Sequence, residues 1–224
     1  MRGLFLLKPN CMNISVLIPV HNTPAHHIIE AIESVATQTY RAKEIIIVND
    51  GSNSPETIEA LELCRKIYNC KVFSLDSQKG ITEALNYGID KCQNEWIARM
   101  DADDICFENR FAKQVEYIMA HPETVVLGTG LFGFLDGDPL RKELFRISKD
   151  PSYHNPDLKE DWIYCTNHPT VMYRKSIISK FGYKHQGKGQ DVHLWAELLR
   201  AGHTINNIPD ILLAYRKYPH NYGG

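Results

Sequence analysis

Four short apolar segments recur in the first hundred residues, and polar stretches with helical spacing follow each of them. The apolar segments are rich in β-branched and aromatic residues, as buried strands are. These candidate strands are residues 14–20, 44–48, 70–74 and 95–100. The candidate helices, with apolar residues three and four positions apart, are 24–36, 55–68, 81–92 and 109–119. Strands and helices that alternate in this way predict a largely parallel sheet with helices on both faces, an α/β fold.

Two of the predicted helices carry the same start signal. Thr23 and Ser54 each precede a proline, and a hydroxyl residue at the N-cap followed by proline at the first helical position favours helix initiation. We therefore expect both helices to begin at these prolines.

The second half of the chain has a less regular pattern. Residues 125–134 and 170–173 read as strands, whereas 136–166 contain no long periodic run. A helix is expected from Asp191, with Trp195 on its apolar side as a core residue and Gly202 as a C-cap.

Neither an internal repeat nor a Ser- or Gly-rich linker divides the chain, so we expect a single domain over residues 13–224 after an extension at 1–12. Within it, residues 13–104 form the predicted nucleotide-binding half. Residues 105–224 form the irregular half that would complete a cleft.

Composition and charge narrow the function classes. Of 224 residues, 43% are hydrophobic and 23% charged, which excludes a disordered or fibrous chain. The formal net charge of -2 supplies no general field for nucleic acid or an anionic membrane, so we expect no nucleic-acid partner. No segment is long and apolar enough to cross a bilayer. Six scattered cysteines without a C-x-x-C pair favour free thiols and a cytoplasmic protein.

Polar residues follow three of the predicted strands, at the edge where α/β sheets bind ligands. His21 follows the first strand, Asp50 the second, and Asp101, Asp103 and Asp104 the fourth. Clustered carboxylates repel one another, and a hard divalent cation, Mg²⁺ or Mn²⁺, would stabilise them. Two structural alternatives stay open: Asp103 or Asp104 caps the next helix, and Asp50 begins an ordinary turn.

These motifs, in this order, resemble the family-2 glycosyltransferases, inverting enzymes with the GT-A fold, over roughly residues 13–216. The matching segments are Ser-Val-Leu-Ile-Pro-Val-His-Asn at 15–22, Ser-Val-Ala-Thr-Gln-Thr-Tyr at 34–40, Glu-Ile-Ile-Ile-Val-Asn-Asp-Gly-Ser at 44–52, Gly-Ile-Thr-Glu-Ala-Leu-Asn at 80–86, Asp-Ala-Asp-Asp at 101–104, His-Pro-Thr-Val-Met-Tyr-Arg at 168–174, Gln-Asp at 190–191 with Leu-Trp at 194–195, and Leu-Ala-Tyr-Arg at 213–216.

The resemblance implies roles on the donor side. Asp50 would accept a hydrogen bond from the base of a nucleotide sugar, and Pro19 and His21 would line the base pocket. Asp101 would face the ribose, and Asp103 would hold the Mn²⁺ or Mg²⁺ that bridges the donor diphosphate.

On the acceptor side, the resemblance makes Asp191 the catalytic base. The family usually has Glu-Asp at this point, and Gln190 removes the flanking charge. From spacing alone, Asp191 reads as a helix N-cap. His168 and His220 are candidates to approach the donor phosphates or the metal, whereas His26 and His27 read as solvent-facing or pocket residues.

The resemblance therefore implies a metal-dependent inverting glycosyltransferase, with a UDP-sugar as the donor most frequent in the family. The acceptor is a glycan, a lipid-linked or another hydroxyl compound, and a lipid-linked one would bring the protein to the cytoplasmic membrane face. Two alternatives stay open at this point: a catalytically silent nucleotide-sugar-binding scaffold and a nucleotidyltransferase. The sequence names neither the sugar nor the acceptor.

Overall fold

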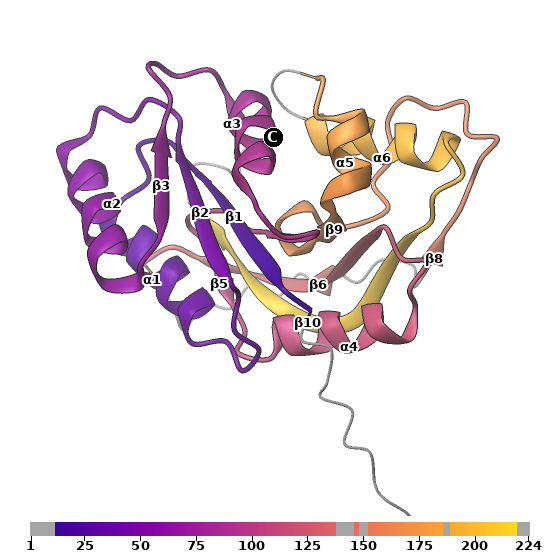
Figure 1. Cartoon of the computed structure of the whole chain (residues 1–224), viewed down its shortest axis with the longest axis horizontal. Coiled ribbons are helices and arrows are strands. Elements are labelled where there is room, and N and C mark those ends of the chain that lie inside the picture. The colour runs from indigo at the N-terminus through magenta and orange to yellow at the C-terminus, as the bar shows by residue number, and fades with distance from the viewer. Residues whose placement is uncertain (1–11, 138–145, 148–151, 186–188, 219–224) are drawn as a thin grey trace, which may run out of the picture.

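A single mixed sheet runs through the protein, with helices on both of its faces (Figure 1). The computed structural model describes residues 12–137, 146–147, 152–185 and 189–218. The strands are β1 Ile14–Val20, β2 Glu44–Asn49, β3 Lys71–Ser74, β4 Trp96–Arg99, β5 Ile105–Cys106, β6 Val126–Leu135, β7 Arg146–Ile147, β8 Ser152–Tyr153, β9 Met172–Arg174 and β10 Ile205–Lys217. The helices are α1 Ala25–Ala36, α2 Pro55–Tyr68, α3 Ile81–Lys91, α4 Arg110–Ala120, α5 Lys175–Phe181 and α6 Gln190–Arg200.

The front half has the predicted parallel arrangement. β1 pairs in parallel with β2 on one side and β4 on the other, and β3 pairs in parallel with β2. In the order β3-β2-β1-β4, β2 and β3 are added on one side of β1, and β4 is then added on its other side. Open α/β sheets bind their ligands at the point where the strand order changes sides in this way.

The rear half turns the sheet into a mixed one. β9 lies between β4 and β6 and is antiparallel to both, while β6 and β10 form a long parallel pair. β5 is antiparallel to β10 at the far end of the strand order. The outcome is a mostly parallel sheet in a single domain, which confirms the expected fold class.

Two hydrophobic cores lie on opposite faces of the sheet. Alternation along β1 sends Val16 and Ile18 to one core and Leu17 to the other, because successive strand residues face opposite sides. The first core contains the buried faces of α1, α2 and α4, and the second contains those of α3, α5 and α6 (Figure 1). Trp195 of α6 is fully buried in the second core, as predicted.

The start signal is confirmed for one helix and wrong for the other. The Ser54 hydroxyl accepts a hydrogen bond from the Thr57 amide at 3.5 Å, and Pro55 opens α2. In contrast, α1 begins at Ala25 and makes no side-chain cap. The Thr23 carbonyl instead accepts the Thr57 hydroxyl at 2.8 Å, which joins the starts of the two helices.

The longest strand and a short helix are absent from the prediction. β10 is irregular because Pro209 and Asp210 interrupt its pairing with β6, where the register shifts between Ile208 and Leu213. Proline cannot donate to a ladder and is tolerated at such bulges. α5 has only seven residues, too few for a clear helical period.

Smaller expectations have mixed outcomes. Gly202 directly follows the C-cap of α6 with a φ of +82°, in the left-handed conformation expected of a C-terminal glycine. The described cysteines are free and buried, and Cys11 lies outside the described residues. None of the described helices combines the length and the apolarity needed to span a membrane.

Candidate active site

The predicted donor-side residues meet in one hollow at the carboxyl edge of the front sheet. This hollow, of about 290 Å³, is called the donor pocket below. Its lining includes Pro19, His21, Asp50, Asp101 and Asp103. Residues from the ends of three different strands therefore lie around one space, as the strand order requires.

Asp50 is buried and holds the entrance of α3 in place. One of its carboxylate oxygens accepts the Lys79 amide at 2.6 Å, and the other accepts the Gly80 amide at 2.9 Å. A carboxylate beside the first amides of a helix is stabilised by the helix dipole. The Asp50 carbonyl also lies 2.7 Å from Nδ1 of His21, which connects the ends of β1 and β2.

The turn after Asp50 requires glycine. Gly51 has a φ of +61°, and a Cβ at this position would lie 2.4 Å from the Gln78 amide nitrogen. The segment before α3 therefore packs directly on the Asp50 turn. Asp50 does begin a turn, as the structural alternative had it, and its side chain also lines the donor pocket.

Asp101 forms a two-pronged ion pair with Arg99 at the end of β4. Arg99 donates from both terminal guanidinium nitrogens to the two carboxylate oxygens, with Nη1 to Oδ2 at 2.9 Å. Arg99 is only 3% exposed, so its charge acts in a poorly solvated space. The sequence analysis did not identify this arginine. The feature of the sequence that could have indicated it is a single cation inside the apolar run Trp-Ile-Ala-Arg-Met at 96–100.

The pKa values of Asp103 and Asp104 are both raised by their surroundings. Burial and the charge of Asp101 raise the pKa of Asp103 above its usual range. Burial raises the pKa of Asp104 well above its usual range, with Asp101 and Asp103 adding to the shift. The Asp104 Oδ1 accepts the Arg216 amide at 3.0 Å, while Oδ2 is buried without a partner. Neither residue caps α4, whose N-cap is Asn109, so the capping alternative is wrong.

The carboxylates of Asp101, Asp103 and Asp104 fit the ligand preference of a divalent cation. Three carboxylates within four positions repel one another, and Asp103 faces the donor pocket. Carboxylate oxygens are the ligands that Mg²⁺ and Mn²⁺ prefer, and a bound cation would favour the charged form of each acid.

Tyr218 is a further residue that the sequence analysis missed. Its hydroxyl donates to Oδ2 of Asp103 at 2.8 Å and lies 3.3 Å from Nδ1 of His27. Tyr218 stands two positions beyond Arg216. His220, a candidate to approach the donor phosphates or the metal, lies outside the described residues.

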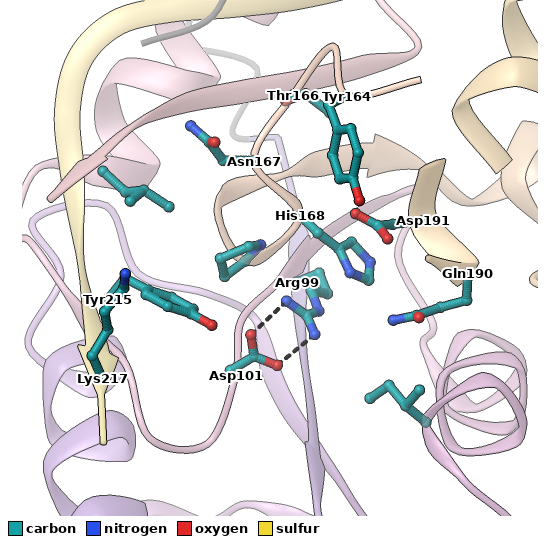
Figure 2. Close-up of a pocket in the computed structure, with 13 residues that line it drawn as sticks. Arg99, Asp101, Tyr164, Thr166, Asn167, His168, Gln190, Asp191, Tyr215 and Lys217 are labelled. Atoms are coloured by element: carbon teal, nitrogen blue, oxygen red, sulfur yellow. Dashed lines mark hydrogen bonds and ion pairs between the residues drawn. The ribbon is translucent and has the colours of Figure 1, made fainter. Parts of the chain in front are cut away.

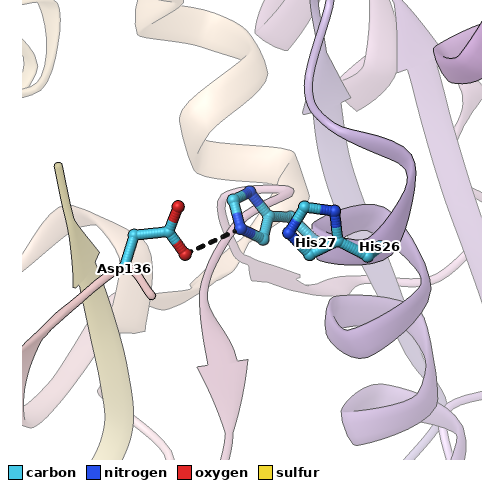
Figure 3. A group of neighbouring side chains, drawn as sticks. All are labelled: His26, His27 and Asp136. Carbon is cyan, nitrogen blue, oxygen red and sulfur yellow. Dashed lines mark hydrogen bonds and ion pairs between the residues drawn. The ribbon is translucent and has the colours of Figure 1, made fainter. Parts of the chain in front are cut away.

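A second group of potential metal ligands consists of His26, His27 and Asp136 (Figure 3). Both ring nitrogens of His27 are already in use, Nε2 at 2.9 Å from Asp136 and Nδ1 near the Tyr218 hydroxyl. The guanidinium of Arg216 also donates to the same Asp136 oxygen at 2.9 Å and would repel a cation. We therefore assign no metal to this group. His27 is 1% exposed and hydrogen-bonded, so its assignment as a solvent-facing or pocket residue is wrong.

A larger cleft of about 600 Å³, the acceptor cleft below, adjoins the donor pocket. Ile81 and Asp101 line both spaces. Asp191 projects into this cleft from the first turn of α6, and Gln190 lines the cleft beside it (Figure 2). Gly189 is the N-cap of α6 and no side chain caps it, so the N-cap interpretation of Asp191 is wrong.

The surroundings of Asp191 raise the pKa of its carboxyl group. Burial raises the pKa of Asp191, and the positive charge of Arg99 opposes that shift. The hydroxyl end of Tyr164 points towards the Asp191 carboxylate from across the cleft (Figure 2). A carboxylate with a raised pKa in a cleft is suited to accept a proton.

His168 lines the cleft but is held by a protein partner. Its Nε2 lies 2.8 Å from the Tyr183 hydroxyl, and the side chain is 7% exposed. Burial and the charge of Arg99 hold the pKa of His168 well below its usual range, so the ring is neutral. The suggestion that it approaches donor phosphates stays a prediction.

Comparison with known proteins decides the family. The sequence profile of glycosyl transferase family 2 matches residues 15–182. The chain belongs to glycosyl transferase family 2. It is 32% identical over 204 residues to the amylovoran biosynthesis glycosyltransferase AmsE of Erwinia amylovora, covering 90% of this chain and 75% of AmsE. It is 28% identical to an Escherichia coli UDP-Gal:alpha-D-GlcNAc-diphosphoundecaprenol beta-1,3-galactosyltransferase, covering 84% of this chain and 67% of that enzyme.

Solved structures support the fold of this glycosyltransferase. S. aureus TarS 1–349, in a structure with UDP-GlcNAc, superposes with a TM-score of 0.69 over 92% of this chain and 59% of the TarS chain. Its sequence identity of 21% makes this similarity evidence for the GT-A fold alone. The protein is a glycosyltransferase, which decides against the nucleotidyltransferase and the silent scaffold.

Proposed function

We propose that this glycosyltransferase transfers a sugar from a UDP-sugar to an acceptor hydroxyl by a single inverting displacement, with a divalent cation. The observation that carries the proposal is the junction of two spaces: the predicted donor residues line one, and Asp191 lines the other. Residues 13–104 would bind the donor, and residues 105–224 would supply the acceptor side.

The donor pocket would hold the nucleotide from three strand ends. Pro19 and His21 would border the base, and Asp50 would accept its hydrogen bond. Both Asp50 oxygens already accept an amide, but each carboxylate oxygen has a second lone pair. Asp101, kept in place by Arg99, would face the ribose.

Asp103 would hold Mn²⁺ or Mg²⁺. It lines the donor pocket, and burial and the charge of Asp101 raise its pKa, so a bound cation would stabilise its charged form. When bound, the cation would neutralise the charge that develops on the leaving diphosphate. Tyr218 would keep the Asp103 carboxylate in a fixed rotamer through its hydrogen bond.

Asp191 would take the proton from the acceptor hydroxyl as that oxygen attacks the anomeric carbon. Its raised pKa supports this role, because a base works best with a pKa near the working pH. Attack from the face opposite the leaving group inverts the configuration. Unlike retaining glycoside hydrolysis, this single displacement needs no second carboxylate as nucleophile.

The names of similar proteins support the choice of substrates. A relative is named for transfer from UDP-Gal to a diphosphoundecaprenol-linked sugar, and a structural neighbour was solved with UDP-GlcNAc. Other relatives are named for amylovoran and O-antigen biosynthesis. We therefore propose a UDP-sugar donor and a place in polysaccharide assembly.

Calorimetric titration with UDP in the presence of Mn²⁺ or EDTA tests the donor assignment. We expect Mn²⁺-dependent binding in the wild type, with UDP preferred over GDP. Asp103→Asn should abolish the Mn²⁺-dependent part and leave the melting temperature of the free protein unchanged, because Asn retains the shape and can accept from Tyr218. At a ligand concentration of about 100 times Kd, bound UDP should stabilise the wild type by about 2.7 kcal/mol.

Asp90→Asn is the matched control, because Asp90 is an exposed acid at the end of α3. The control should bind UDP as the wild type does. Metal-independent UDP binding in the wild type, or an unchanged Mn²⁺ response in Asp103→Asn, would overturn the metal assignment. Nuclear magnetic resonance of the product's anomeric signal tests inversion separately.

A further inference from the structure

Two large, exposed aromatic side chains contact each other, and one of them lines the acceptor cleft. Trp162 is 40% exposed and Tyr164 is 61% exposed, although both side chains offer large apolar faces that burial would stabilise. Tyr164 lines the cleft itself. The two rings contact each other at 69° with centroids 5.8 Å apart.

Two histidines complete an aromatic cluster around Trp162. The centroid of His193 lies 5.2 Å from that of Trp162, at an angle of 81°. His185 lies 6.5 Å from Trp162 at 78° and 4.4 Å from His193. Edge-to-face contacts of this kind fix the orientation of a ring, since the positive edge of one meets the negative face of the other.

Backbone packing also fixes the position of Trp162 relative to Asp191. A Cβ on Gly189 would lie only 2.2 Å from Cη2 of Trp162, so the indole rests on the glycine backbone at the N-cap of α6. Asp191 stands two residues further on. The hydroxyl end of Tyr164, whose ring contacts Trp162, points towards the Asp191 carboxylate (Figure 2).

We propose that Trp162 and Tyr164 form a platform for a pyranose ring of the acceptor, so that the acceptor hydroxyl reaching Asp191 belongs to a saccharide. This inference rests on the proposed function, which places the acceptor beside Asp191. A pyranose has a face of C–H groups that packs on the negative face of an aromatic ring. Its hydroxyls need hydrogen-bond partners, which the Tyr164 hydroxyl and the two imidazoles can supply.

The same surface is a poor match for other occupants. An acyl chain would leave the polar groups of Tyr164, His185 and His193 without partners, at the desolvation cost of buried polar atoms. An open-chain polyol has no flat apolar face to cover the indole. The platform therefore favours a cyclic sugar over both.

Tryptophan fluorescence can observe the platform directly. Trp96 and Trp195 are buried, at 5% and 0% exposure, so iodide quenching reports chiefly on Trp162. The probes are methyl pyranosides of glucose, galactose and N-acetylglucosamine, with sorbitol and decyl phosphate as comparisons, each with and without UDP and Mn²⁺. We expect at least one pyranoside to protect wild-type Trp162 from iodide, and neither comparison compound to do so.

Variants then separate the platform from the fold. Trp162→Ala should weaken binding of the protecting pyranoside, measured by saturation-transfer nuclear magnetic resonance, by about tenfold. Trp162→Phe, which keeps an aromatic face and covers any folding defect of the alanine variant, should stay within about threefold of the wild type. Both variants should bind UDP with unchanged affinity. Ile67→Ala, at an exposed apolar residue of α2, is the control and should change neither measurement.

Each result has a defined meaning. The saccharide platform is overturned if no pyranoside protects Trp162 from iodide, or if sorbitol or decyl phosphate protects it equally well. If UDP still binds in that case, the proposed function stands. Equal pyranoside affinity in Trp162→Ala and the wild type also overturns it. Failure of UDP to bind the wild type overturns the proposed donor function, and the acceptor inference with it.

Discussion

The two halves of this glycosyltransferase are held together by different kinds of contact. In the front half, β1, β2 and β3 are each followed in the chain by a helix that packs on the sheet through an apolar face. In the rear half, buried polar side chains join strands that are distant in sequence. The Gln114 amide of α4 donates to the carbonyls of Leu127 at 3.0 Å and Thr170 at 2.9 Å.

Arg110 has the same function one turn earlier. It is fully buried, donates to the Arg99 carbonyl at 2.8 Å and donates to the Gln114 amide oxygen at 3.2 Å. β4, β6 and the short 3-10 helix His168–Thr170 that precedes β9 are thus joined through two side chains of α4. The front half therefore depends on local apolar packing, and the rear half on long-range polar contacts that cost most when one partner is lost.

The largest expected effect is on catalysis. Asp191→Asn should lower the rate of sugar transfer by roughly two to four orders of magnitude, because the amide cannot take the acceptor proton. UDP affinity and the melting temperature should stay close to those of the wild type. Single-turnover kinetics, calorimetry and thermal melts on this variant make the measurement.

Glu56→Gln is the matched control, since Glu56 is also an acid in the first turn of a helix, α2 in the front half. A loss of rate in both variants would point to helix-dipole effects rather than to a base. Near-wild-type transfer by Asp191→Asn would end the assignment of Asp191.

The buried hydrogen bonds of Gln114 in the rear half predict the next effect. Gln114→Met should lower the free energy of unfolding by about 2–6 kcal/mol, because two buried carbonyls each lose a donor at a cost of about 1–3 kcal/mol. Urea denaturation provides the value. Gln93→Met, at an exposed glutamine, should change it by less than about 0.5 kcal/mol. Equal values for the two would remove the distinction drawn between the halves.

Apolar packing in the front half predicts a smaller effect. A Cβ on Gly88 of α3 would lie 2.2 Å from Cδ1 of Leu17, so Gly88→Ala should cost about 1–3 kcal/mol through overpacking. Leu17→Val removes the colliding methyl groups. If the contact is the cause, the double variant should recover at least about 0.5 kcal/mol of the sum of the single effects. Strict additivity in urea denaturation would contradict the argument.

The smallest effect appears in the pH dependence of stability. The pKa of His168 lies well below its usual range in the folded protein, so below about pH 6.5 the unfolded chain binds a proton that the folded protein does not. This histidine should therefore lower stability by about 1.4 kcal/mol per pH unit as the pH falls from 6.5 towards 5. His168→Gln should lack that part of the slope, and parallel curves for the two proteins would show that His168 is not its source.

Prediction from sequence succeeded where the signal was local. The front strands and helices follow from apolar periodicity, and the meeting of Asp50, Asp101 and Asp103 around one pocket follows from their place at strand ends. It failed at β10, where Pro209 interrupts the period, and at the start of α1, where the Thr23 carbonyl bonds to Thr57 instead. Arg99 and Tyr218 were missed because their partners lie at positions that no local pattern connects with a site.

The sequence by itself determined the α/β class, the order of the front sheet elements and the acids at their ends, because strand and helix periods are properties of neighbouring residues. Only the tertiary structure decided that Asp191 lines a cleft with a raised pKa, and that Trp162 rests on Gly189, two residues before it. Burial, charge pairing and ring contacts depend on distances between residues far apart in the chain. Those distances exist only after folding, so the surroundings of Asp191 could not be derived from the order of the residues.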